Sequence, residues 1–265
     1  MVKVIEKLNT CNLKSKPPIN IMGAIITQPT KIESKYTINI DWFEATVMGV
    51  ILPSYIEEPL QTISYDNDNI VLKYAKYGTK HFKYVYDVYF ANEKESFATI
   101  QTAPRAKILD SLMSIIKIEN YCLYSEGWTS KFEYLREALG VEVNNITRLD
   151  IATDGRGFRS MFEKVDNGSL SIVGRAKLNA HGTEVINGVR KADSYVYGTA
   201  KSSKQISIYH KGISIEEQNK QYIANFWLKN GLIANYEQRE EIERAELRLY
   251  RKAINLIVDN EMIDE

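Results

Sequence analysis

The stretch "NITRLDIATD", residues 145–154, alternates apolar and polar side chains in the way that a half-buried β-strand does. The strand period places Arg148, Asp150 and Asp154 on one face, and the leucine and isoleucine between them on the other. Paired carboxylates on a strand that faces a cleft are what a hard divalent cation such as Mg²⁺ or Mn²⁺ needs. An ordinary surface pair of Asp150 with Arg148 explains the same pattern. The pattern alone leaves both interpretations open.

A second charged stretch, "RAELRLY" at residues 244–250, reads in two ways. Its charge content favours a helix, whereas its alternation favours a strand. As a strand it would bring Arg244, Glu246 and Arg248 onto one face. One carboxylate between two guanidiniums suits either metal binding or a row of surface salt bridges, and this segment taken alone favours the salt bridges.

The third stretch, "DSYVYGTAKSSKQISIYHKG" at residues 193–212, is typical of a hairpin with Tyr195 and Tyr197 on either side of Val196. A phenol beside such a turn could attack a phosphodiester, although most of the 17 tyrosines must simply pack or lie on the surface. The second strand ends at Lys211. The turn supplies cations and hydroxyls that suit phosphate oxygens: Lys201, Ser202, Ser203 and Lys204.

Charge is unevenly distributed along a chain whose formal net charge is zero. Residues 155–212 hold 10 Lys and Arg against 4 Asp and Glu, a net of +6, while both flanking regions are negative. This basic middle indicates a local phosphate-binding surface or, equally, a solvated basic face. The sequence has no HxH, HExxH or GxxxxGK[ST] motif, which argues against a histidine-cluster metal site and against nucleotide hydrolysis.

Composition predicts an ordinary globular protein of 265 residues, 44% of them apolar and 26% charged. No apolar run is long enough for a membrane span, and Cys11 and Cys122 are most simply free thiols in a reducing cytoplasm. The Pro-Pro pair in "LKSKPPIN" predicts an extended N-terminal arm or linker over residues 1–30, followed by one domain over residues 31–265.

The remaining pattern predicts an α+β fold, a twisted and mainly antiparallel sheet backed by helices. Strands are expected near residues 36–50 and 96–102, with a hairpin around Gly78. Helices are expected over residues 105–118, after Trp128 as far as Gly140, and over residues 159–165 and 216–232.

Three motifs in order, "TRLDIATD", "YGTAKSSKQISIYHKG" and "ERAELRLY", resemble the Rep_trans family, the replication initiation factors of rolling-circle plasmids and some phages. The upstream "IDWFEATV" and "YSEGW" are also similar to that family, so that the resemblance covers roughly residues 37–255. It implies an endonuclease of the relaxase type that nicks one DNA strand at an origin, in a single-stranded or cruciform region. Such a protein stays joined to the 5′ phosphate through a tyrosine and leaves a 3′ hydroxyl for the polymerase.

The resemblance also implies roles for individual residues. Asp150 and Glu246 would hold one Mg²⁺ or Mn²⁺, with Asp154 as a third ligand, and Lys211 would neutralise the phosphate. The three motif strands are then expected to be neighbours, because both carboxylates must reach one metal. A host helicase and polymerase are expected partners, and a homodimer is a further expectation. The expected DNA contacts are Lys201, Ser202, Ser203, Lys204 and Arg148.

One position departs from the family pattern. The family tyrosine lies two residues before the glycine, and that position here is Val196. A one-residue bulge would bring a flanking tyrosine into place. We then expect Tyr197, which adjoins Gly198, to be the nucleophile, with Tyr195 as the alternative. The competing interpretation is a DNA-binding homologue that has lost nicking and acts as a regulator or accessory factor.

Overall fold

The computed structural model describes residues 35–52, 57–171, 178–182, 184–186, 189–191, 193–199 and 201–263. The predicted N-terminal arm over residues 1–30 lies outside these ranges. No helix within them is long and apolar enough to span a bilayer.

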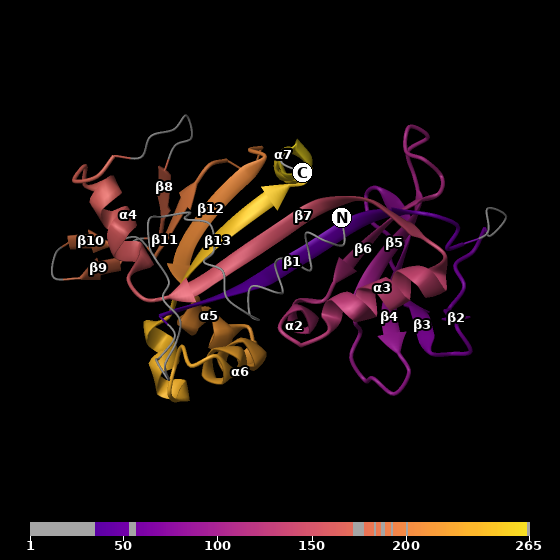
Figure 1. The fold of residues 1–265 in the computed structure, drawn as a ribbon, viewed down its shortest axis with the longest axis horizontal. Coiled ribbons are helices and arrows are strands. Elements are labelled where there is room, and N and C mark those ends of the chain that lie inside the picture. Colours follow the sequence, from indigo (N-terminus) through magenta and orange to yellow (C-terminus); the bar gives the residue numbers. More distant parts are fainter. Residues whose placement is uncertain are drawn as a thin grey trace.

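The fold is α+β and is built on one twisted antiparallel sheet of 11 strands (Figure 1), as the sequence predicted. From edge to edge the strand order is β2-β3-β4-β5-β6-β1-β7-β13-β12-β11-β8. A separate two-stranded sheet pairs β9 with β10. The strands are β1 (Tyr36–Met48), β2 (Thr62–Tyr65), β3 (Ile70–Tyr74), β4 (Phe82–Phe90), β5 (Ala98–Pro104), β6 (Met113–Ile118), β7 (Glu142–Gly155), β8 (Leu178–His181), β9 (Glu184–Ile186), β10 (Val189–Lys191), β11 (Ser194–Tyr197), β12 (Lys204–His210) and β13 (Glu243–Tyr250).

Two long central strands join the halves of the sheet. β1 has 13 residues and β7 has 14, and Figure 1 shows them running side by side through the middle of the molecule. Their pairing contains register shifts, one of them between Ile40 and Trp42. Such bulges strengthen the local twist and leave an extra residue, here Asp41, outside the regular pairing.

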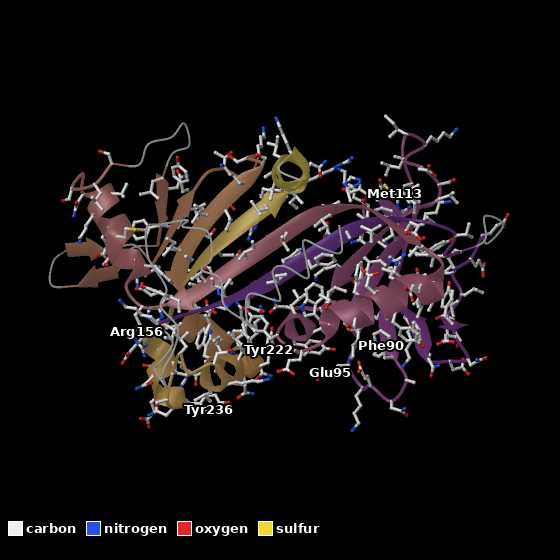
Figure 2. All side chains as sticks on the ribbon, viewed as in Figure 1. Phe90, Glu95, Met113, Arg156, Tyr222 and Tyr236 are labelled. Carbon is white, nitrogen blue, oxygen red and sulfur yellow. The ribbon has the colours of Figure 1, made fainter. Side chains whose placement is uncertain are left out.

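The helices fill in around this sheet. They are α2 (Asn120–Leu123), α3 (Trp128–Leu139), α4 (Phe158–Asp166), α5 (Lys211–Glu217), α6 (Gln221–Lys229), the 3₁₀ helix η1 (Tyr236–Glu241) and α7 (Arg251–Ile263). α3 packs Trp128 and Phe132 against Phe43 of β1, which anchors the main core. α2 and α6 meet at Tyr222, whose hydroxyl donates to Asn120 Oδ1 at 2.5 Å (Figure 2).

Two helix predictions are wrong in instructive ways. The segment 105–118 is not a helix: its second part is β6, in which Ser114, Ile116 and Ile118 alternate inward, and Ile108 is 92% exposed. The expected helix over residues 216–232 is interrupted between α5 and α6. Asn219 adopts a positive φ of 54°, a conformation that ends a helix and that asparagine tolerates well.

The predicted hairpins and the neighbouring motif strands are confirmed. β3 pairs with β4, and β11 pairs with β12. The ambiguous tail is a strand followed by a helix, β13 and α7, and β13 lies between β7 and β12. The three sequence motifs that predict function therefore lie on adjacent strands.

Candidate functional site

The pairing of β7, β13, β12 and β11 defines one polar face of the sheet. Residues directly opposite each other on paired strands point to the same side. Asp150 is opposite Arg248, and Glu246 is opposite Ser207, which is in turn opposite Val196. Since Glu246 and Arg248 are two residues apart on one strand, all of these side chains share the polar face.

We call Asp150 and Glu246 the acidic pair. The two residues are diagonal neighbours on β7 and β13, and the guanidinium of Arg248 contacts both carboxylates. Arg248 Nη2 donates to Glu246 Oε1 at 3.0 Å, and Arg248 Nε donates to Asp150 Oδ2 at 3.3 Å. Both carboxylates are buried, with 2% and 6% of their residues exposed, whereas the Arg248 side chain remains 27% exposed. The predicted proximity of the two carboxylates is therefore present, with an arginine between them.

Two further residues complete the surroundings of the acidic pair. Arg148 donates to both oxygens of Asp150, through Nε at 3.0 Å and through Nη2, and its guanidinium lies over the Trp42 ring at 4.1 Å. The Tyr209 hydroxyl donates to Glu246 Oε2 at 3.0 Å. Burial raises the pKa of Tyr209 well above its usual range and the Glu246 carboxylate adds to this, although Arg244 opposes it. The Tyr209 phenol is therefore neutral and acts as a hydrogen-bond donor.

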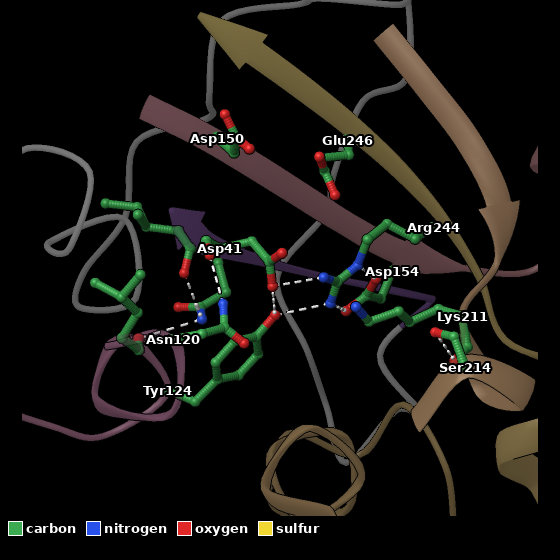
Figure 3. Close-up of polar contacts among 12 residues, drawn as sticks. Asp41, Asn120, Tyr124, Asp150, Asp154, Lys211, Ser214, Arg244 and Glu246 are labelled. Atoms are coloured by element: carbon green, nitrogen blue, oxygen red, sulfur yellow. Dashed lines mark hydrogen bonds and ion pairs between the residues drawn. The ribbon is translucent and has the colours of Figure 1, made fainter. Parts of the chain in front are cut away.

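A second cluster on the same face surrounds Arg244, which is completely buried (Figure 3). Its Nε and Nη2 donate to the two oxygens of Asp154 at 2.7 and 2.8 Å, and its Nη1 donates to Asp41 Oδ1 at 2.6 Å. The Tyr124 hydroxyl accepts from Nη2 at 2.7 Å and donates to Asp41 at 2.5 Å. Trp227 of α6 donates to Asp154 at 2.7 Å. This Arg244 cluster is a closed network of hydrogen bonds.

Asp154 belongs to the Arg244 cluster and not to the acidic pair. It is four residues from Asp150 along β7, which corresponds to about 13 Å of extended strand. Both of its carboxylate oxygens accept hydrogen bonds from Arg244 or Trp227. In this structure Asp154 therefore holds the buried Arg244, and its role as a third metal ligand stays a prediction.

Asp41 was not foreseen from the sequence. Burial would raise the pKa of its carboxyl, but the charges of Arg244 and Lys211 and the bonds from Tyr124 and Arg244 outweigh it and hold that pKa well below the usual range. Asp41 is therefore an anion that stabilises the buried arginine. The short-range signal that could have found it is "NIDWF", an acidic residue inside an apolar strand.

Lys211 begins α5 and is buried beside the Arg244 cluster, with 3% of the residue exposed (Figure 3). Its backbone N–H donates to Ile242 O at 3.1 Å, and its Nζ lies 5.6 Å from the centre of the Tyr209 ring. Burial lowers the pKa of Lys211 to about 8, and the neighbouring positive charge of Arg244 acts in the same direction. If Lys211 neutralises a DNA phosphate, as expected from the resemblance, that phosphate has to approach an amine that is buried in this structure.

Tyr195 and Tyr197 lie on the opposite face of the sheet from the acidic pair. Tyr195 is opposite Ile208 and packs with it and with residues of α4, only 2% exposed. Tyr197 is opposite Ile206 on the same apolar side. The pairing of β11 with β12 runs without a shift over Ser194–Tyr197, so the expected bulge is absent there. Val196 and Ser194 are the β11 residues on the face of Glu246, and Val196 is in the same row as that carboxylate.

The Tyr209 hydroxyl contacts the acidic pair, and sequence reasoning missed this residue. The alternation of "QISIYH" with "RAELRLY" contains the necessary signal, because Tyr209 and Glu246 share a face once the register of the two strands is known. That register became known only from the fold.

Three of the predicted DNA-contact residues, Lys201, Ser202 and Ser203, lie in the turn that precedes β12. Lys201, Ser202 and Ser203 line an open depression of about 410 Å³ together with Tyr250 and Lys252, from the junction of β13 and α7. The Ser203 carbonyl accepts from the Tyr250 N–H at 2.9 Å, which fixes the turn against β13. Tyr250 is opposite Arg148, the arginine that donates to Asp150, which connects the depression with the surroundings of the acidic pair. Lys204 begins β12 and is exposed, but it is opposite Leu249 and therefore points to the face away from the acidic pair.

The acidic pair can be judged as a metal site by its donor atoms. Carboxylate oxygens are hard ligands, and Mg²⁺ often takes only one or two carboxylates together with substrate phosphates and water. Among the residues that the structure describes, no group of three or more Asp, Glu, His or Cys side chains is arranged for a metal ion. The pair therefore fits a cation that shares its coordination with a phosphate.

We predict that Lys211 titrates near pH 8, as seen by NMR of its side-chain carbon or nitrogen, below the value of about 10.4 that is usual for a lysine side chain in water. Because the native pKa is the lower one, the unfolded chain binds more protons between pH 8 and about 10.5. The wild-type free energy of unfolding should therefore rise across this window relative to that of Lys211→Met. A Lys211 pKa above 10 would contradict the buried position.

Comparison with solved structures finds chains of similar fold. A rolling circle replication initiator protein from Geobacillus stearothermophilus is 13% identical to this chain, with a TM-score of 0.47 over 86% of this chain and 80% of its own. The sequence matches no family model and no curated protein.

Proposed function

We propose that this chain is a rolling-circle replication initiator, which binds origin DNA and nicks one strand with the help of Mg²⁺ or Mn²⁺ at Asp150 and Glu246. The observation that carries the proposal is the acidic pair itself. Its two carboxylates come from two of the three motifs that resemble the Rep_trans family, and they meet on one face of the sheet within reach of a single guanidinium.

Different residues would have different roles in binding and nicking the DNA. The carboxylates of the acidic pair would hold the metal ion, which when bound would polarise the phosphate to be cleaved. The lysines and hydroxyls of the depression at residues 201–203 would hold the DNA backbone beside the pair. Tyr197 as the nucleophile, with Tyr195 as the alternative, requires the end of β11 to turn over toward the polar face, beside Gly198 with its φ of 101°.

A second candidate is a DNA-binding homologue that does not nick. The position of Val196 favours it. Val196 lies in the same row across the sheet as Glu246, with Ser207 between them, where a tyrosine would face the acidic pair. The pairing of both carboxylates with arginines also suits a purely structural network.

A nicking assay distinguishes the two candidates. Supercoiled origin DNA is incubated with the protein and Mn²⁺, and the products are treated with protease. We expect nicked DNA that carries a protein adduct, lost in Tyr197→Phe and in Glu246→Gln but kept in Tyr236→Phe, which changes an exposed tyrosine of η1 whose hydroxyl donates to Asn225 (Figure 2). The non-nicking candidate predicts DNA binding without an adduct, and a gain of nicking in Val196→Tyr. If the adduct still forms in Tyr197→Phe but is lost in Tyr195→Phe, the nucleophile is Tyr195.

Binding measured against salt tests the DNA surface. Replacing Lys201 and Lys204 with alanine should weaken binding to all DNA sequences and lower the slope of log K against log salt by about 1 for each lost phosphate contact. The matched control is the double replacement of Lys80 and Lys83, which are exposed in the other half of the sheet. An unchanged slope in the Lys201 and Lys204 variant would show that the DNA binds to another part of the protein.

A further inference from the structure

Arg248 has a different position from the other arginines of the polar face. Arg244 is completely buried and its bonds close a network, while Arg148 contacts Asp150 but is not within hydrogen-bond distance of Glu246. Arg248 contacts both members of the acidic pair and also donates from Nη1 to Gln205 Oε1 at 3.3 Å. Its guanidinium thus lies between the two carboxylates that would hold a metal ion.

The charges around the acidic pair balance without a metal. Asp150 and Glu246 contribute two negative charges, and Arg148 and Arg248 contribute two positive charges. A divalent cation added to this neutral group would leave it at +2, with the ion close to a guanidinium in a largely buried place. If Arg248 moves away, the net charge of the group with the bound ion falls to +1, and an incoming phosphate can neutralise it. Electrostatics therefore oppose the simultaneous presence of ion and guanidinium.

We propose that the Arg248 guanidinium takes the place of the divalent cation between Asp150 and Glu246, and that the ion binds by displacing it. This inference rests on the proposed metal site and assigns Arg248 as the residue that sets its affinity. Arg248 is suited to the exchange because its side chain is 27% exposed and can swing into solvent. Asp150 keeps both bonds from Arg148 when Arg248 leaves, and Glu246 keeps the bond from Tyr209.

Mn²⁺ binding to the DNA-free protein tests the inference, with free Mn²⁺ followed by electron paramagnetic resonance. Arg248→Gln removes the competing charge and should bind Mn²⁺ about tenfold more tightly than wild type, a discounted figure for a partly exposed charge. Arg248→Lys keeps the charge and should stay near wild type. The matched control is Arg156→Gln, which removes an arginine paired with Glu241 outside the polar face.

The double variant Glu246→Gln with Arg248→Gln should lose the tight site, which would show that the gain belongs to the acidic pair. Equal Mn²⁺ affinity in wild type and Arg248→Gln would overturn the inference, and so would a gain that persists in the double variant. If Glu246→Gln weakens Mn²⁺ binding while Arg248→Gln changes nothing, the proposed metal site survives and only the competition fails.

A wild-type measurement covers the case in which Arg248→Gln does not fold. The side-chain Nε–H signal of Arg248, assigned by its absence in Arg248→Lys, is followed by NMR during Mg²⁺ titration. We expect it to move to the position of a solvent-exposed arginine at saturating Mg²⁺, while the Arg244 signal stays unchanged. A fixed Arg248 signal at saturation would overturn the inference.

Discussion

The buried guanidinium of Arg244 is the interaction on which the rest of the structure depends. It connects Asp154 of β7 with the bulged Asp41 of β1 and with Tyr124 at the end of α2, while Trp227 of α6 completes the group. Every one of these contacts crosses between elements that are distant in the chain. Loss of one partner from a buried charge network leaves an uncompensated charge, which typically costs about 3–5 kcal/mol. The network therefore holds the central strands in one register.

That register decides which side chains meet. A shift of one residue along β13 would move Glu246 to the apolar face and separate it from Asp150. With the register in place, the two polar clusters differ in character. The Arg244 cluster is buried and closed, whereas the acidic pair retains partly exposed arginines, one of which, Arg148, is opposite Tyr250 of the depression at residues 201–203. A fixed structural cluster beside a more open one is the arrangement expected where a scaffold positions a reactive site.

Strand alternation in the sequence predicted which side chains share the polar face, but not how they contact each other. Alternation in residues 148–154 and 244–250 was enough to group Asp150, Glu246 and their arginines by face. It could not supply the bridge by Arg248 or the role of Asp41, because both follow from pairing across some 100 to 200 residues. Periodicity misled at residues 105–118, where apolar spacing fits a helix although the burial of alternate residues shows a strand. For the tyrosines, alternation puts Tyr195 and Tyr197 on the opposite face from Val196, and the regular pairing of β11 keeps them there.

The central claim is that Asp150 and Glu246 form a divalent-cation site on a face built for DNA phosphates. The most direct measurement is a crystal structure of the protein soaked in Mn²⁺, with data collected at the manganese absorption edge. The account predicts an anomalous peak between the two carboxylates, at about 2.0–2.6 Å from an oxygen of each, with Arg248 turned away. Crystals saturated with Mn²⁺ that show no peak there, and Arg248 still bonded to both carboxylates, would contradict it.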